Sequence, residues 1–140
     1  MTLAFREAQD VNLENVVNLW KACELTRPWN DPYKDIQFAR EGATSTVLVG
    51  ILDDRIVASV MVGHDGHRGV IYYLAVDPAF RKRGYGKAAV AAGETWLRER
   101  GVWKINLMVR NDNAAAGRFY ERLGYEVNPV ISYGKRLDGP

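Results

Sequence analysis

The stretch that decides the fold runs from Leu74 to Lys87 and reads LAVDPAFRKRGYGK. An apolar run feeds through a basic turn with two glycines into a segment of helical spacing. The N-terminus of a helix binds anions because its first N–H groups have no partner inside the helix. Gly84 and Gly86 leave those amides without a Cβ in front of them, and four of the chain's 19 Lys and Arg residues lie in the turn. The turn therefore predicts a site for a diphosphate.

Two other phosphate-binding motifs match this turn less well. A Walker A loop needs Ser or Thr after its lysine, whereas the lysine here precedes Ala88, and the first glycine of that motif is missing. Gly84, Gly86 and Ala89 match the residue pattern of a dinucleotide-binding fingerprint, Gly-x-Gly-x-x-Gly/Ala. In that fingerprint the first glycine should follow its strand almost directly, yet several residues separate it from the strand end at Val76. A plain loop with solvated charges is the third interpretation of the turn taken by itself.

Working outward from the turn, the hydrophobic pattern predicts strands and helices along the whole chain. Apolar β-branched or alternating runs indicate strands, and apolar residues three and four apart indicate helices. The expected strands cover residues 2–8, 46–52, 56–63, 70–76, 105–109, 125–127 and 131–137. The expected helices cover residues 13–23 behind an N-cap at Asp10, 33–41 behind Pro32, 85–100 before a stop at Gly101, and 116–123 before a stop at Gly124. We therefore expect an α/β (α+β) protein.

The composition is that of an ordinary globular domain. The chain has 140 residues, 47% hydrophobic and 26% charged, with a net charge of +2. A chain of this length buries one core without disulfides, so we expect a single domain over residues 1–140. The small net charge predicts no nucleic-acid partner. The absence of a long apolar run predicts no membrane partner and a cytoplasmic location. The single cysteine, Cys23, is expected to be a buried hydrophobe, and no metal site is expected.

The basic turn also belongs to a longer pattern. Arg81, Gly84 and Gly86 match Arg/Gln-x-x-Gly-x-Gly/Ala, and residues 113–125 read NAAAGRFYERLGY, in which Tyr120 follows the first asparagine by seven positions. These two motifs, in this order, resemble those of the GCN5-related N-acetyltransferase (GNAT) superfamily. Three loops also resemble small bacterial members of the YpeA type, at residues 27–32, 64–69 and 134–137.

The resemblance implies a GNAT fold and acetyl-CoA as cosubstrate. The fold would be a mixed, mostly antiparallel sheet of about seven strands with four helices, in which strands four and five splay apart at a bulge. The pantetheine arm would lie in that gap and pair with the backbone of Leu74, Ala75 and Val76. Asn113 would hydrogen-bond the pantetheine chain and also cap its helix. The diphosphate would bind the turn, at Arg81, Lys82, Arg83, Gly84, Tyr85, Gly86 and Lys87.

The resemblance further implies acetyl transfer to a primary amine of a small molecule, peptide or protein, by direct attack in a ternary complex. Tyr120 matches the family's acid, which protonates the departing thiolate, although it also lies on the apolar stripe of its helix. The Val76 N–H is the expected oxyanion donor. The base stays open, because ribosomal-protein N-terminal acetyltransferases carry a Glu where Met108 stands here. The remaining candidates for the base are Tyr72, Tyr73, Asp31, His64 and His67.

The acceptor side is expected at the loop between the first two helices. Trp29, Asn30 and Asp31 are the expected substrate residues, although a loop fixed by tryptophan packing and an Asp-Pro turn explains the same letters. Neither the acceptor amine nor the oligomeric state, a homodimer included, follows from the sequence. Two further function classes stay open. One is a CoA-binding module without catalysis, favoured by the missing base, and the other is nucleic-acid binding by the basic turn.

Overall fold

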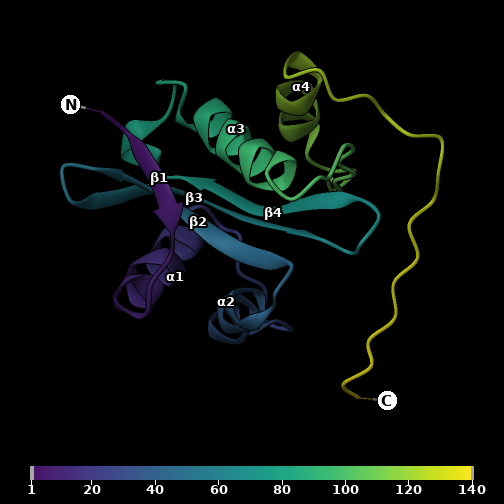
Figure 1. The fold of residues 1–140 in the computed structure, drawn as a ribbon, viewed down its shortest axis with the longest axis horizontal. Coiled ribbons are helices and arrows are strands. Elements are labelled where there is room, and N and C mark those ends of the chain that lie inside the picture. The colour runs from purple at the N-terminus through teal and green to yellow at the C-terminus, as the bar shows by residue number, and fades with distance from the viewer. Residues whose placement is uncertain (1, 140) are drawn as a thin grey trace. The chain divides into compact units, whose positions relative to one another are not determined.

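In the computed structural model, which describes residues 2–139, the chain divides into two units, Met1–Met108 and Val109–Pro140. The first unit is built on a four-stranded sheet in the order β1-β2-β3-β4, with every neighbouring pair antiparallel (Figure 1). The strands are β1 Ala4–Glu7, β2 Ser45–Leu52, β3 Arg55–His64 and β4 Gly69–Val76. Asp53 and Asp54 connect β2 to β3 with φ of 50° and 62°, as in the two-residue turns that match strand twist. The prediction of one domain stays a prediction.

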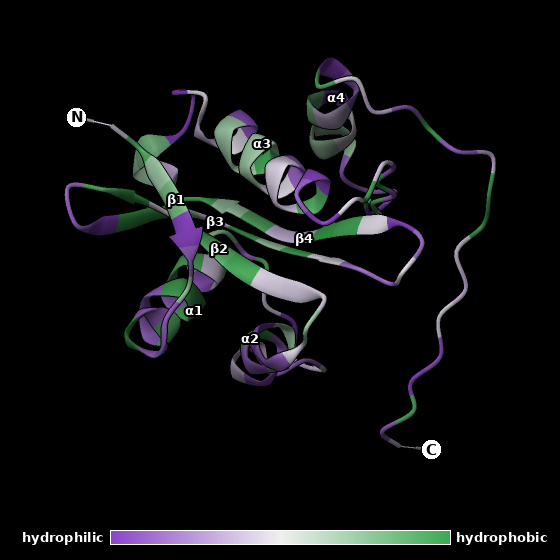
Figure 2. Ribbon diagram, in the orientation of Figure 1, coloured by the Kyte–Doolittle hydropathy of each residue, from purple (hydrophilic) through white to green (hydrophobic). Residues whose placement is uncertain are grey.

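Helices cover both faces of this sheet, which explains why its central strands are apolar on both sides. α1 (Leu13–Ala22) and α2 (Pro32–Glu41) lie on one face, and α3 (Tyr85–Arg98) lies on the other (Figure 1). In Figure 2 the hydrophobic colour follows β2, β3 and β4 between these helices. One core layer joins Val16 and Trp20 of α1 to Ile36 of α2. The opposite layer includes Val90 and Leu97, both about 1% exposed.

A bulge in β4 is confirmed by the register of its pairing with β3. Ser59 lies opposite Ala75 and Met61 opposite Tyr72, so Tyr73 and Leu74 together face a single residue of β3. Tyr73 has φ of 49°, in the left-handed region that a residue with a bulky side chain rarely adopts. A conformation of this kind persists only where the surroundings hold it. The packing around Tyr73 therefore holds the bulge in place.

The predicted number of strands is wrong, because the sheet has four strands in the part of the chain that is described. The expected strand at residues 105–109 forms a single parallel bridge from Ile105 to Gly69, with Gly69 N–H bonded to the Lys104 carbonyl at 2.9 Å. The chain then leaves β4, so the alternation of its side chains continues without a ladder. The expected strands at 125–127 and 131–137 are absent as well. Their apolar side chains, such as Ile131 and Leu137, are exposed, and alternation alone forms no strand without a partner.

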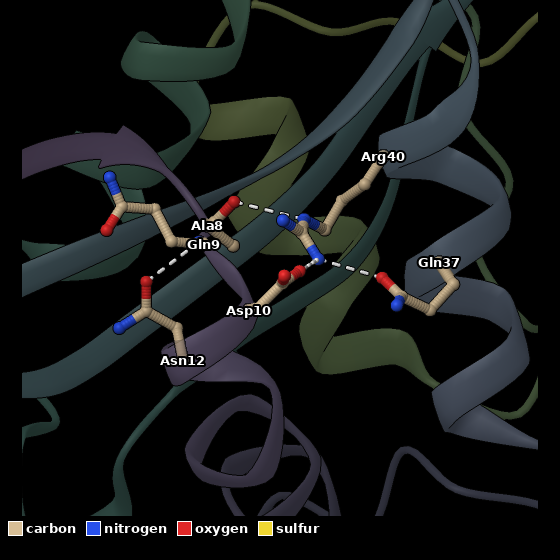
Figure 3. A network of polar contacts seen from close by, with 6 residues as sticks. All are labelled: Ala8, Gln9, Asp10, Asn12, Gln37 and Arg40. Atoms are coloured by element: carbon tan, nitrogen blue, oxygen red, sulfur yellow. Dashed lines mark hydrogen bonds and ion pairs between the residues drawn. The ribbon is translucent and has the colours of Figure 1, made fainter.

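The predicted N-cap of the first helix is also wrong. α1 follows a 3₁₀ turn, Asp10–Asn12, and Asp10 instead forms an ion pair with Arg40 of α2 at 2.8 Å. Figure 3 shows the same guanidinium donating to the Ala8 carbonyl at 3.0 Å and to Gln37 at 2.8 Å. Arg40 thereby ties α2 to the end of β1. The prediction missed this because the partner lies 30 residues away in the chain.

The second unit contains α4, Ala114–Arg122. The Asn113 side chain accepts a hydrogen bond from the Ala116 N–H at 3.1 Å, which confirms its role as N-cap. Gly124 has φ of 94° and follows the last turn, which confirms it as the stop. Gly101 ends α3 in the same way, with φ of 81°.

Candidate active site

The basic turn connects the end of β4 to α3 and has the geometry of an anion site. Gly84 precedes α3 with φ of 79°, and an added Cβ there would meet no atom within 4 Å. The Ala88 N–H is the first to bond back into the helix, to the Gly84 carbonyl at 3.0 Å. The N–H groups of the first three helical residues, Tyr85 to Lys87, therefore precede the helical ladder. The two glycines and the helix N-terminus thus lie together at the start of α3.

Aromatic contacts shape the approach to this turn. The Phe80 ring lies between two guanidinium groups, at 5.2 Å from Arg55 and 5.1 Å from Arg83. Asp77 caps the short 3₁₀ helix Pro78–Phe80 through the Ala79 N–H at 2.9 Å and pairs with Arg55 at 3.3 Å. Arg83 is thus held beside the glycines by a cation–π contact.

The predicted pantetheine strand, Leu74 to Val76, lies on β4, the edge strand of the four-stranded sheet. Ala75 is buried against the core, so its side chain packs inward. The Cys23 thiol donates to the Val76 carbonyl at 3.2 Å, which ties the end of this strand to the end of α1. Cys23 is half-buried and packs against the core, as expected of a small hydrophobe.

A cleft of about 840 Å³ lies within the first unit, on the α2 side of the sheet. Its wall is formed by α2, by the β3–β4 hairpin and by the bulge of β4. Three large side chains that are otherwise exposed, Phe38, Tyr72 and Met108, line it. Of the candidates for the base, Tyr72, Tyr73, His64 and His67 line it too. The cleft therefore gathers residues that the sequence places in four separate segments.

Sequence reasoning missed Asp35, which lines the cleft from the first turns of α2. Its Oδ2 accepts the hydroxyl of Tyr73 at 2.7 Å. The Tyr73 ring stacks on Trp20 with centroids 3.9 Å apart, and the Trp20 indole N–H donates to the buried Ser59 hydroxyl at 3.0 Å. Burial, followed by the bond to Asp35, raises the pKa of Tyr73. Tyr73 is therefore a hydrogen-bond donor and a poor base.

The three expected acceptor residues have different positions in the structure. Asn30 lines the cleft, and Trp29 is exposed in the same loop. Asp31 is the N-cap of α2, and its Oδ1 accepts the Tyr33 N–H at 2.9 Å and the Lys34 N–H at 3.4 Å. Its carboxylate thus has a structural role, as the turn interpretation expects.

We expect Asp31→Ala to lower the free energy of unfolding by about 1 kcal/mol, because two backbone N–H groups of α2 lose their acceptor. Asp31→Asn keeps the side-chain oxygen, so its effect should be a few tenths of that value. Urea denaturation measures both. If Asp31 also binds the acceptor, KM for the amine rises in Asp31→Asn although stability does not change. An unchanged KM in both variants would leave Asp31 as a cap alone.

In the second unit, Tyr120 lies on α4 with Phe119 and Tyr125 at its edges, with ring centroids 5.0 Å and 5.6 Å away. Burial raises the pKa of Tyr120 to about 12. The hydroxyl is therefore protonated at neutral pH, as a proton donor must be.

This raised pKa predicts a pH dependence of stability. The tyrosine of an unfolded chain titrates near pH 10, so the folded state holds the proton more tightly. The resulting stabilisation is complete below pH 10 and is lost as pH rises through about 12. We expect the free energy of unfolding of the wild type, relative to Tyr120→Phe, to fall by about 2 kcal/mol over this range. Denaturant melts of both proteins from pH 9 to 12 test it, and parallel curves would contradict it.

Comparison with known proteins supports the pattern of motifs. The model of the acetyltransferase (GNAT) family matches residues 13–125. The chain belongs to the GNAT family of acetyltransferases. An acetyltransferase of Yersinia enterocolitica is 45% identical to this GNAT protein over 135 residues, which are 96% of each chain. An acetyltransferase of Pectobacterium atrosepticum is 48% identical over 126 residues, 90% of this chain and 89% of its own.

Solved structures share the fold of this GNAT protein. The aminoglycoside acetyltransferase AAC(6')-Iy superposes with a TM-score of 0.83 at 19% identity, covering 98% of this chain and 100% of its own. The protein is thus an N-acetyltransferase with acetyl-CoA as its cosubstrate, as the sequence predicts. Among residues 2–139, no cluster of three His, Cys, Asp or Glu side chains is arranged to hold a metal. Within the same residues, no helix is long and apolar enough to span a membrane.

Proposed function

We propose that this GNAT enzyme transfers the acetyl group of acetyl-CoA to a primary amine bound in the cleft between α2 and β4. The proposal rests on the path of β4, which lies within the first unit and joins the cleft to the basic turn. Its bulge at Tyr73 lines the cleft, and its end at Val76 leads directly into the basic turn. Tyr73 and Val76 are only three residues apart on this strand. An extended ligand along this edge would place its anionic end at the turn and its other end at the cleft.

The residues present suit acetyl-CoA. The open space at Gly84 and the helix N–H groups after it would hold the diphosphate, with Arg81, Lys82, Arg83 and Lys87 as counter-charges. The backbone of Leu74 to Val76, on the edge strand, would pair with the amides of the pantetheine arm. When bound, acetyl-CoA supplies an activated acetyl group as a thioester.

Two groups of the protein would then assist the transfer, one as a hydrogen-bond donor and one as a proton donor. The Val76 N–H would stabilise negative charge on the carbonyl oxygen, and the Tyr120 hydroxyl would give its proton to the departing sulfur. Asn113 would hydrogen-bond the pantetheine arm through the part of its side chain that the helix cap leaves available. A tyrosine hydroxyl keeps its proton at neutral pH, as the proposed donor must, and the burial that raises the pKa of Tyr120 does not change this.

Proteins of the same fold are consistent with this proposal. AAC(6')-Iy has been solved with a bisubstrate analogue of CoA and an acetylated neamine, and a related soil enzyme has been solved with sisomicin. A Clostridium acetobutylicum protein described as a predicted acetyltransferase has been solved with acetyl-CoA, at a TM-score of 0.79 and 14% identity. Those ligands belong to those proteins, and they support a cosubstrate and an amine as the reactants here.

The proposal is tested by the release of free thiol from acetyl-CoA in the presence of a panel of primary amines. We expect turnover with at least one amine, with the N-acetylated product identified by mass spectrometry. Thiol release that does not depend on any amine, with no acetylated product, would contradict the assignment.

A further inference from the structure

The cleft contains two carboxylates, Asp35 and Asp65, and they differ in what holds them. The Oδ1 of Asp65 accepts the N–H groups of His67 at 2.9 Å and Arg68 at 2.8 Å, and these bonds, that from Arg68 first, lower the pKa of Asp65. The Oδ1 of Asp65 thus holds the backbone of the β3–β4 hairpin. Asp35 supports no backbone group with its carboxylate among residues 2–139, where its side chain bonds to Tyr73 alone.

Asp35 is held in place through Tyr73, which is itself fixed by its neighbours. Its Oδ2 accepts the Tyr73 hydroxyl, and Tyr73 is fixed by stacking on Trp20 and by the bulge that it occupies. Trp20 is fully buried and bonded to Ser59. A carboxylate with one oxygen anchored in this way keeps the other oxygen at a defined place in the cleft. This arrangement stabilises a bound cation at little cost in side-chain entropy.

Arg68 of the β3–β4 hairpin forms no ion pair with Asp35. The Arg68 guanidinium lies over the Trp103 ring at 4.4 Å and donates to the His67 carbonyl at 3.2 Å, so it belongs to the hairpin. Phe38, one turn further along α2, and Met61, Tyr72 and Met108 give the wall large apolar and aromatic surfaces, beside polar side chains such as Asn30 and Ser45. Aromatic faces and a carboxylate together favour a single cation attached to an apolar body.

We propose that Asp35, positioned by Tyr73, binds the ammonium group of the acceptor, and that the acceptor is a monocationic primary amine with an apolar or aromatic body. This inference rests on the proposed function, because it names the class of substrate for the same cleft. A polycationic acceptor would bring further ammonium groups into a cleft whose one other carboxylate, Asp65, already accepts two backbone N–H groups of the β3–β4 hairpin.

The test uses 2-phenylethylamine as the probe. We expect Asp35→Asn to raise its KM, or its Kd by calorimetry, at least about tenfold, because a hydrogen bond to a charged group is lost. KM for acetyl-CoA should stay within about twofold.

Asp65→Asn is the matched control, because Asp65 lines the same cleft and asparagine can keep the hydrogen bonds of its turn. It should change KM for the amine by less than about twofold. Tyr73→Phe releases Asp35 and should give an intermediate increase. We also expect 2-phenylethanol, the neutral analogue, to bind wild type and Asp35→Asn equally weakly.

Three results would overturn the inference. They are an unchanged amine affinity in Asp35→Asn, an equal loss in Asp65→Asn, and a higher kcat/KM for sisomicin or spermidine than for 2-phenylethylamine. The calorimetric measurement separates this inference from the proposed function. If the wild type acetylates no amine but binds 2-phenylethylamine in an Asp35-dependent way, the proposed function fails and the ammonium site stands. If the wild type acetylates amines and Asp35→Asn does so equally well, the proposed function stands and the ammonium site fails.

Discussion

Gly84→Val should reduce the affinity for acetyl-CoA at least about 100-fold while the protein remains folded. Gly84 has φ of 79° and open space around its Cβ position, immediately before the free N–H groups of α3. A valine side chain would fill the space that a diphosphate needs to reach those amides. The loss of two hydrogen bonds to a charged ligand corresponds to a change of that size. Calorimetry with CoA measures the affinity directly.

The control for this substitution lies at the other end of the same helix. Gly101 has φ of 81° and equally open space, so Gly101→Val carries the same backbone strain without approaching the turn. Both variants should lose a similar amount of stability, on the order of 1 kcal/mol. Only Gly84→Val should lose the cofactor. Near-normal CoA affinity in folded Gly84→Val would refute the assignment of the diphosphate to this turn, and an equal loss in Gly101→Val would indicate an effect of strain.

The parts of the structure that were predicted from the sequence are those set by local patterns. Asn113 caps α4 and Gly84 opens α3 because caps and turns depend on a few neighbouring residues. The bulge of β4 came from the family resemblance, not from periodicity. The strand expected at residues 105–109 failed because alternation indicates which side chains share a face but not whether a partner strand is there.

The cleft shows the other limit of sequence reasoning. Asp35 and Tyr73 are 38 positions apart, and a carboxylate in the first turn of a short polar helix gives no signal of its own. The one indication in the sequence was that Asp35 follows Asp31 by four positions. Asp31 already caps the helix, so the cap does not explain a second aspartate. Their contact arises from the packing of α2 beside the bulge, which is a tertiary property. Met108, by contrast, was correctly noted as a residue that cannot serve as the base.

Tyr120→Phe should lower kcat by about 100-fold or more and leave the affinity for acetyl-CoA within about threefold. The substitution removes one hydroxyl and keeps the ring between Phe119 and Tyr125, so the packing of α4 is preserved. The departing sulfur would then have to leave without a positioned proton. The Tyr120 hydroxyl, whose pKa burial raises to about 12, carries its proton across the neutral range as any tyrosine does. Single-turnover thiol release measures the chemical step, and calorimetry measures the affinity.

The matched control for this variant is Tyr125→Phe, which removes a hydroxyl from the ring that meets Tyr120 edge-on at 5.6 Å. It should leave kcat within about twofold, since the proposed proton transfer does not involve it. A loss of kcat in both variants would point to disturbed packing of the aromatic cluster instead of a missing proton. Full activity in Tyr120→Phe would make Tyr120 a packing residue of α4. In that case another group must protonate the thiolate, and because the CoA affinity is measured separately, the cofactor assignment would be unaffected by that outcome.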